Sequence, residues 1–177
     1  MNISEEEKRI SDVFATWITI FALTCGGVFG LVQYLHSKEK EEVDRTITFY
    51  TSFNAPPILD YRIKLAESYE SKYSDIYNTL TAKNKSNDDI THDYELIIIN
   101  MFNNDKELQK SLFVTMEFLH GVAVCGEKKL CEDSTTRSLF GQYGKSFYRQ
   151  YYPYIKELRS KWKDTSIGID FENYFNK

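Results

Sequence analysis

An uncharged apolar segment near the N-terminus constrains this chain more than any other feature. Residues Val13–Leu35 contain no Asp, Glu, Lys or Arg over 23 positions. A helix of that length would be about 35 Å long, enough to cross the roughly 30 Å hydrocarbon core of a bilayer. Trp17 and Tyr34 lie near its ends, where aromatic rings anchor at membrane interfaces, and charged residues flank both sides. The segment therefore predicts a transmembrane helix.

A signal peptide and a buried core helix are the alternatives for such a segment. A signal peptide would need a basic start, a shorter apolar stretch and small residues at a cleavage site. This chain instead begins with Met-Asn-Ile-Ser-Glu-Glu-Glu-Lys. We therefore expect residues 1–12 to form a short acidic leader and residues 13–35 to be a membrane span.

Small residues recur at four-residue intervals within the span. Ala22, Gly26 and Gly30 fall on one helical face, where they would let a second helix approach closely. This pattern favours a homo-oligomer. Because one helix cannot enclose a pore, any channel function would require several copies.

The charges next to the span differ slightly between its two sides. Lys8 and Arg9 precede the span, while Lys38, Lys40 and Arg45 follow it. Under the positive-inside rule this small excess favours a cytosolic C-terminal side. We therefore expect a single-pass protein of the inner (cytoplasmic) membrane whose C-terminal domain is cytosolic.

The three cysteines support the same compartment. Cys25 lies in the span, and Cys125 and Cys131 are the other two. Secreted domains of this size often carry many cysteines, and this chain does not. The alternatives are a domain with one disulfide and a reduced cytosolic domain, and the reduced domain is the simpler interpretation.

The rest of the chain predicts an all-α protein, in which the span is followed by a helical bundle of about six helices. We expect residues 36–55 to form a helical stalk that ends at Pro56-Pro57, and residues 56–177 to form one soluble domain. A 3.6-residue apolar period from Leu59 to Leu80, supplied largely by tyrosines, predicts one amphipathic helix. Further helices are expected over residues 91–102, after Asn104, and after Asp133 or Ser134; residues 165–177 are expected to dock on the core.

Motifs that would indicate catalysis or metal binding are incomplete. Gly144-Lys145-Ser146 lacks the earlier glycine and the strand of a phosphate-binding loop. Glu117-x-x-His120 is half of a carboxylate-bridged di-iron motif, and no second half accompanies it. His120, Cys125 and Cys131 lack the paired spacing and the fourth ligand of a zinc site. We therefore predict no enzyme activity, no catalytic residue, no metal and no cofactor.

The stretch from Arg137 to Lys163 is strongly basic. It holds seven Lys or Arg residues and one acid, Glu157, whereas the whole chain has a net charge of −4. Aromatic residues alternate with these cations, a pattern typical of surfaces that bind phosphates and stacked bases. A solvated face, structural ion pairs or contact with anionic lipid are the alternatives. The residues predicted to bind an anionic ligand are Lys145, Tyr148, Arg149, Tyr152, Lys156 and Arg159.

The C-terminal half also resembles a known type of protein. The segments 116–123, 130–133 and 154–159 resemble a family of small prokaryotic membrane-anchored helical proteins of unknown function, in which one N-terminal span precedes a cytosolic helical domain. The overall layout resembles ancillary membrane effectors of type III CRISPR systems, in which a soluble domain binds cyclic oligoadenylate and a membrane region responds. This resemblance implies a role in antiviral defence.

Two functions follow as hypotheses. In the first, an oligomeric, non-enzymatic membrane effector binds a cyclic oligonucleotide on its basic helices and rearranges its spans, without binding duplex nucleic acid. In the second, a membrane-tethered adaptor binds a protein partner or anionic lipid and has no small-molecule ligand.

Overall fold

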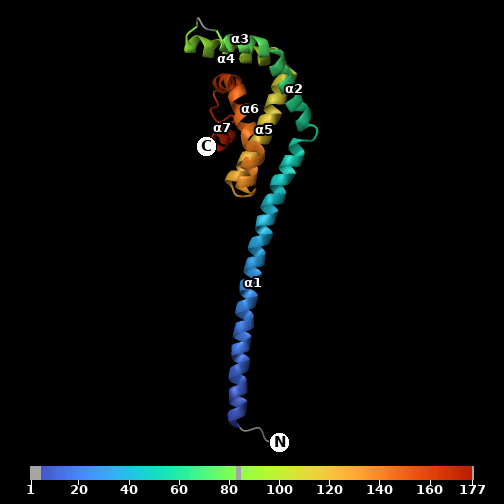
Figure 1. The fold of residues 1–177 in the computed structure, drawn as a ribbon, viewed down its shortest axis with the longest axis vertical. Coiled ribbons are helices and arrows are strands. Elements are labelled where there is room, and N and C mark those ends of the chain that lie inside the picture. The colour runs from blue at the N-terminus through green and yellow to red at the C-terminus, as the bar shows by residue number, and fades with distance from the viewer. Residues whose placement is uncertain (1–4, 83–84, 177) are drawn as a thin grey trace. The chain divides into compact units, whose positions relative to one another are not determined.

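The computed structural model describes residues 5–82 and 85–176, with side chains from Phe14 onward. Within this part the chain forms seven helices and no strand, so the all-α prediction is confirmed (Figure 1). The first four residues of the expected leader lie outside the described residues, as do residues 83–84 and 177. The helices are α1 (Glu5–Phe53), α2 (Ile58–Ser71), α3 (Tyr73–Leu80), α4 (Asn87–Asn103), α5 (Lys106–Glu127), α6 (Asp133–Trp162) and α7 (Ile169–Phe175).

The first of two compact units contains α1 up to Glu41. This helix is long and apolar enough to span a membrane, and its apolar side chains are exposed. The hydroxyls of Thr19 and Thr24 donate to backbone carbonyls four residues earlier, at 2.8 and 2.7 Å. These bonds satisfy polar groups that would otherwise be costly in lipid.

The second unit begins at Glu42 and therefore includes the C-terminal end of α1. Thr46 and Phe53 are buried there, and the Phe53 ring lies 5.3 Å from that of Phe140 on α6. The expected stalk at 36–55 is thus not a uniform spacer, because its second half belongs to the domain core.

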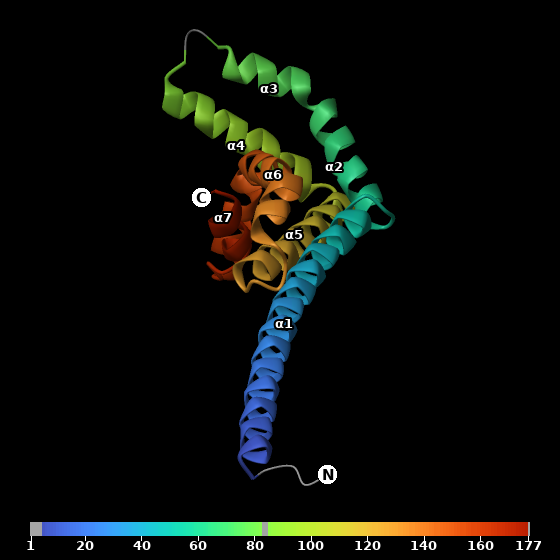
Figure 2. The same ribbon diagram turned by 60° about the horizontal axis from the view of Figure 1, so that its bottom comes forward.

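Aromatic packing holds this domain together. Phe102 on α4 stacks on Tyr154 on α6 with ring centroids 4.5 Å apart, and both side chains are buried. Helix α7 lies beside α5 and α6, as Figure 2 shows, and it buries Tyr174 and Phe175. The expected docking of the C-terminal tail is confirmed for these residues.

Several predicted helix boundaries are wrong. The helix expected over residues 58–80 divides at Lys72, where the amide donates to the carbonyl of Tyr69 in a tightened last turn. Helix α4 begins at Asn87, earlier than expected, because Ser86 and Asp89 form a capping box. Residues 137–162 of the basic stretch lie on one helix, α6, which continues through Pro153.

The N-terminus of α6 also differs from the prediction. Its cap is Glu132, whose carboxylate accepts from the amides of Ser134 at 3.0 Å and Thr135 at 2.5 Å. A carboxylate at this position satisfies free amides and interacts favourably with the helix dipole.

Candidate ligand-binding pocket

Four of the six predicted anion-binding residues lie along one face of α6. Lys145, Arg149, Tyr152 and Lys156 recur at helical spacing, and we call them the basic stripe. Arg149, Tyr152 and Lys156 are exposed and Lys145 is half-buried. Lys156 lies 3.4 Å from the Glu95 carboxylate on α4, whereas no described residue pairs with Lys145 or Arg149.

The other two predicted residues, Tyr148 and Arg159, attach α7 to α6. Arg159 donates to the Glu172 carboxylate at 2.7 Å and to the Ile167 carbonyl at 2.8 Å. Tyr148 is buried with its ring 5.6 Å from that of Phe171, and burial raises the pKa of its hydroxyl. Neither side chain is free to contact a ligand, so the structure brings together only the basic stripe.

A pocket that the sequence did not reveal lies between α2 and α6. Its volume is about 420 Å³, which falls in the range of ligand pockets. Burial raises the pKa of the Tyr143 and Tyr151 hydroxyls above the ordinary tyrosine value. We call this the tyrosine pocket; its aromatic lining residues are Tyr69, Tyr73, Tyr143, Phe147 and Tyr151.

Arg62 forms a polar part of the pocket wall. Its guanidinium carbon lies 3.5 Å from the ring centroid of Phe53 and 4.7 Å from that of Tyr143. Nη1 donates to the Phe53 carbonyl at 2.8 Å, which satisfies a free acceptor at the end of α1. Nε is buried and has no hydrogen-bond partner among the described residues. Arg62 therefore fixes α2 against the end of α1 and places positive charge beside the pocket.

Apolar side chains extend from the pocket along α2 and α3. Ile63 is 46% exposed, Tyr73 60%, Tyr77 55% and Leu80 55%. The rings of Tyr73 and Tyr77 are stacked with centroids 6.1 Å apart. We call these four residues the exposed rim. They belong to the apolar stripe that predicted an amphipathic helix, and the described part of the chain does not cover them.

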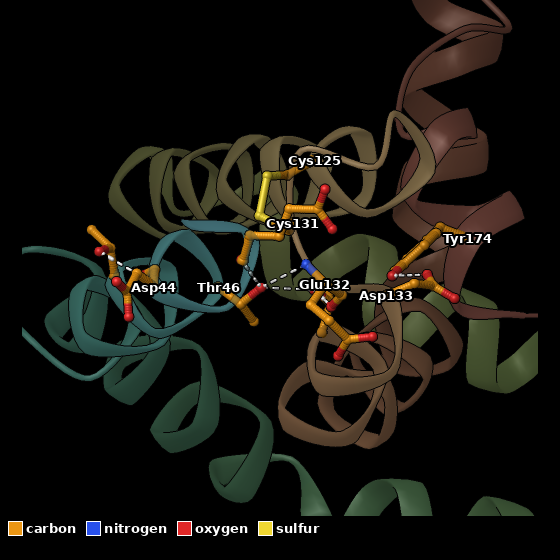
Figure 3. Close-up of a disulfide and its surroundings, with 10 residues drawn as sticks. Asp44, Thr46, Cys125, Cys131, Glu132, Asp133 and Tyr174 are labelled. Carbon is orange, nitrogen blue, oxygen red and sulfur yellow. Dashed lines mark hydrogen bonds between the residues drawn. A yellow bond between two sulfur atoms is a disulfide. The ribbon is translucent and has the colours of Figure 1, made fainter. Parts of the chain in front are cut away.

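A disulfide joins the C-terminal end of α5 to the start of α6. Cys125 and Cys131 are bonded and buried, with Cα atoms 5.1 Å apart (Figure 3). Beside the disulfide, the Glu132 amide donates to Thr46 Oγ1 of α1 at 3.2 Å. The structure therefore contains one disulfide, the alternative to the simpler interpretation of a reduced pair. Cys25 has a free thiol.

The described residues contain no group of three or more His, Cys, Asp or Glu side chains that could hold a metal ion. The most distinct feature of the described residues is the tyrosine pocket together with the exposed rim. Comparisons of the chain with protein-family models, with curated proteins and with solved structures found no match.

Proposed function

We propose that this protein is a membrane-anchored, non-enzymatic adaptor that binds a segment of a partner protein on the tyrosine pocket and the exposed rim. The observation that carries the proposal is the exposed apolar stripe of α2 and α3. Monomeric domains bury such stripes, and exposed aromatic patches mark interaction sites. Tyrosine is also enriched among the residues that dominate binding energy at protein interfaces.

The extent of the surface favours a protein partner over a small molecule. A small ligand would fill the pocket between α2 and α6 and leave Tyr77 and Leu80, which do not line the pocket, exposed. A partner segment would insert one large apolar side chain into the pocket and cover Tyr73, Tyr77 and Leu80 with its flanking residues. Arg62 and Glu70, which both line the pocket, offer opposite charges to orient that segment.

The disulfide supports an extracytoplasmic domain. Disulfides persist in oxidising compartments and are rare in the cytosol, where thiols are kept reduced. This proposal replaces the expected cytosolic placement, which rested on a small difference in Lys and Arg count and on the low number of cysteines. The expected homo-oligomer, packed through Ala22, Gly26 and Gly30, stays a prediction.

A second candidate function keeps the anionic ligand. Lys145 and Arg149 have no internal ion pair within the described residues, and Tyr152 lies between them and Lys156 on the same face. Such a stripe suits a phosphate-bearing ligand such as a cyclic oligonucleotide, or anionic lipid. This function would need the domain to face the compartment that holds the ligand.

Photocrosslinking in cells tests the adaptor proposal. A photoreactive phenylalanine analogue at Tyr73 is expected to give one discrete protein adduct. In that background, Ile63→Glu should remove the adduct, because it places a charge on the rim. Leu96→Glu on α4 is the matched control, since Leu96 is 43% exposed and Ile63 is 46% exposed. The control should leave the adduct unchanged.

Two outcomes would overturn the adaptor proposal. One is the absence of a discrete adduct, and the other is equal loss in both glutamate variants. A thermal shift of the purified chain with a cyclic oligonucleotide, removed by Arg149→Ala and retained in Ile63→Glu, would favour the second candidate.

A further inference from the structure

A second cavity, of about 410 Å³, lies between α5 and the connection from α6 to α7. It shares no lining residue with the tyrosine pocket. We call it the acidic cleft; its lining residues include Phe113, Glu117, His120, Trp162, Asp164 and Asp170.

Local backbone geometry shapes this cleft. The α5 residues Phe113, Met116, Glu117 and His120 follow helical spacing, so one face of the helix forms one wall. Opposite, Gly168 adopts φ +70°, and a Cβ there would lie 2.6 Å from the Phe171 ring. Any other residue at position 168 would have a strained backbone and a side chain obstructed by Phe171, which explains why glycine occupies this position.

The cleft is negatively charged. Glu117, Asp164 and Asp170 line it, and no described lysine or arginine does. The Ser166 hydroxyl and amide donate to Asp164 Oδ1 at 2.6 and 2.9 Å, and these bonds lower the pKa of the Asp164 carboxyl. His120 Nδ1 lies 3.3 Å from Asp170 Oδ2. The charge is opposite to that of the basic stripe, although both belong to the same domain.

An aromatic wall accompanies the carboxylates. Trp162 stacks on Phe113 with the ring planes 2° from parallel and the centroids 5.4 Å apart. This contact fixes the indole while 54% of Trp162 stays exposed. Indole is the aromatic group that attracts cations most strongly through its ring face. A cavity that combines carboxylates with an exposed, fixed indole has the chemistry of sites for organic cations.

We propose that the acidic cleft binds a small organic ammonium group. The carboxylates attract its positive charge, and Trp162 and Met116 contact its alkyl substituents. A strongly hydrated inorganic cation would gain little binding energy from the aromatic wall. An alkylammonium group gains binding energy from both the carboxylates and the aromatic wall. The group can come from a free amine or from a choline-type lipid headgroup, since both present the same cation.

Tryptophan fluorescence tests this inference directly, because Trp17 and Trp162 are the only two tryptophans. The full-length Trp17→Phe chain, purified in maltoside micelles that carry no ammonium group, leaves Trp162 as the only indole. Titration with choline should change its fluorescence saturably. The neutral isostere 3,3-dimethyl-1-butanol should have no saturable effect, since it matches choline in shape and lacks the charge.

Variants separate binding from general electrostatics. The double variant Asp164→Asn with Asp170→Asn should weaken choline binding about tenfold or more. Asp75→Asn on α3, outside the cleft, should not change it. A circular dichroism spectrum equal to that of the parent confirms that each variant is folded.

A comparison of nanodiscs made from two different lipids identifies the source of the ammonium group. If phosphatidylcholine nanodiscs alone shift the emission, and phosphatidylglycerol nanodiscs do so only after choline is added, the ligand is a headgroup. If free choline binds equally in both, the ligand is a free amine. The proposal is overturned if choline gives no saturable change, if the neutral isostere acts equally, or if the cleft variant binds as the parent does.

Discussion

Reduction of the Cys125–Cys131 disulfide should destabilise the domain by a calculable amount. The two cysteines are six positions apart, so the bond closes a short loop. The loop-closure relation gives about 2 kcal/mol for a loop of this length, less than a long loop would provide. Reduction breaks the S–S bond and adds one hydrogen to each sulfur but removes no heavy atom, so the loss of stability reflects the cross-link and not a cavity.

The assay is thermal unfolding of the full-length Cys25→Ser chain in micelles, with and without reductant. Near-UV circular dichroism reports the packing of the aromatic core, whereas helicity in α1 would persist in detergent. For a domain of this size, about 2 kcal/mol corresponds to a decrease in Tm of roughly 5 to 10 °C. The variant Cys125→Ser with Cys131→Ser is the control, and its Tm should not respond to reductant.

One result would refute this reasoning. If mass spectrometry confirms complete reduction and the Tm of the Cys25→Ser chain is unchanged, the cross-link does not restrict the unfolded chain as calculated. An equal decrease in the double-serine control would show that the reductant acts elsewhere.

Two further perturbations test the packing of α6. Hydrogen bonds from the hydroxyl and amide of Thr135 and the amide of Ser134 lower the pKa of Glu132 from 4.5 to about 2. A lowered folded-state pKa stabilises the fold above the ordinary pKa, and this contribution is lost as pH falls from about 4.5 to about 2. A Tm series over that range should therefore fall more steeply in the wild type than in Glu132→Gln; parallel curves would contradict the assignment. Gly144→Ala places a Cβ 2.6 Å from the Phe175 ring and should cost about 1 to 3 kcal/mol in chemical denaturation. Gly141→Ala lies on the same helix, and no other described part of the chain comes within 4 Å of the new Cβ beyond the neighbouring turns of the helix itself. This change should instead stabilise by about 0.5 to 1 kcal/mol, and equal effects at both positions would contradict this packing.

The all-α fold followed from periodicity because each helix buries an apolar stripe that recurs every three or four residues. The break at Lys72 did not follow, since the stripe from Leu59 to Leu80 keeps its period across it. The apolar period identified one face of the helix as apolar, but it did not indicate which other helix would cover that face. Ile63, Tyr73 and Tyr77 remain exposed because coverage depends on how the helices are arranged, which short-range pattern does not contain.

The candidate sites show the same division between local and distant information. The sequence predicted a basic surface from seven cations, six of which lie on α6. Which of them can bind a ligand depends on partners elsewhere in the chain. Arg159 pairs with Glu172 on α7, and Lys156 with Glu95 on α4. The tyrosine pocket is lined by residues of α2 and α6, which lie far apart in sequence. The large number of tyrosines was therefore its only signal in the sequence.

Membrane orientation connects the two candidate functions, because each requires its ligand on one side. A formed Cys125–Cys131 bond in cells would place the domain in an oxidising compartment, where a cytosolic nucleotide cannot reach Lys145 and Arg149. The same placement leaves the exposed rim open to an extracytoplasmic partner. A reduced pair in cells would reverse both statements, since Arg149 would then face the cytosol. The redox state of this one pair therefore separates an adaptor on Tyr73 and Tyr77 from a nucleotide receptor on α6.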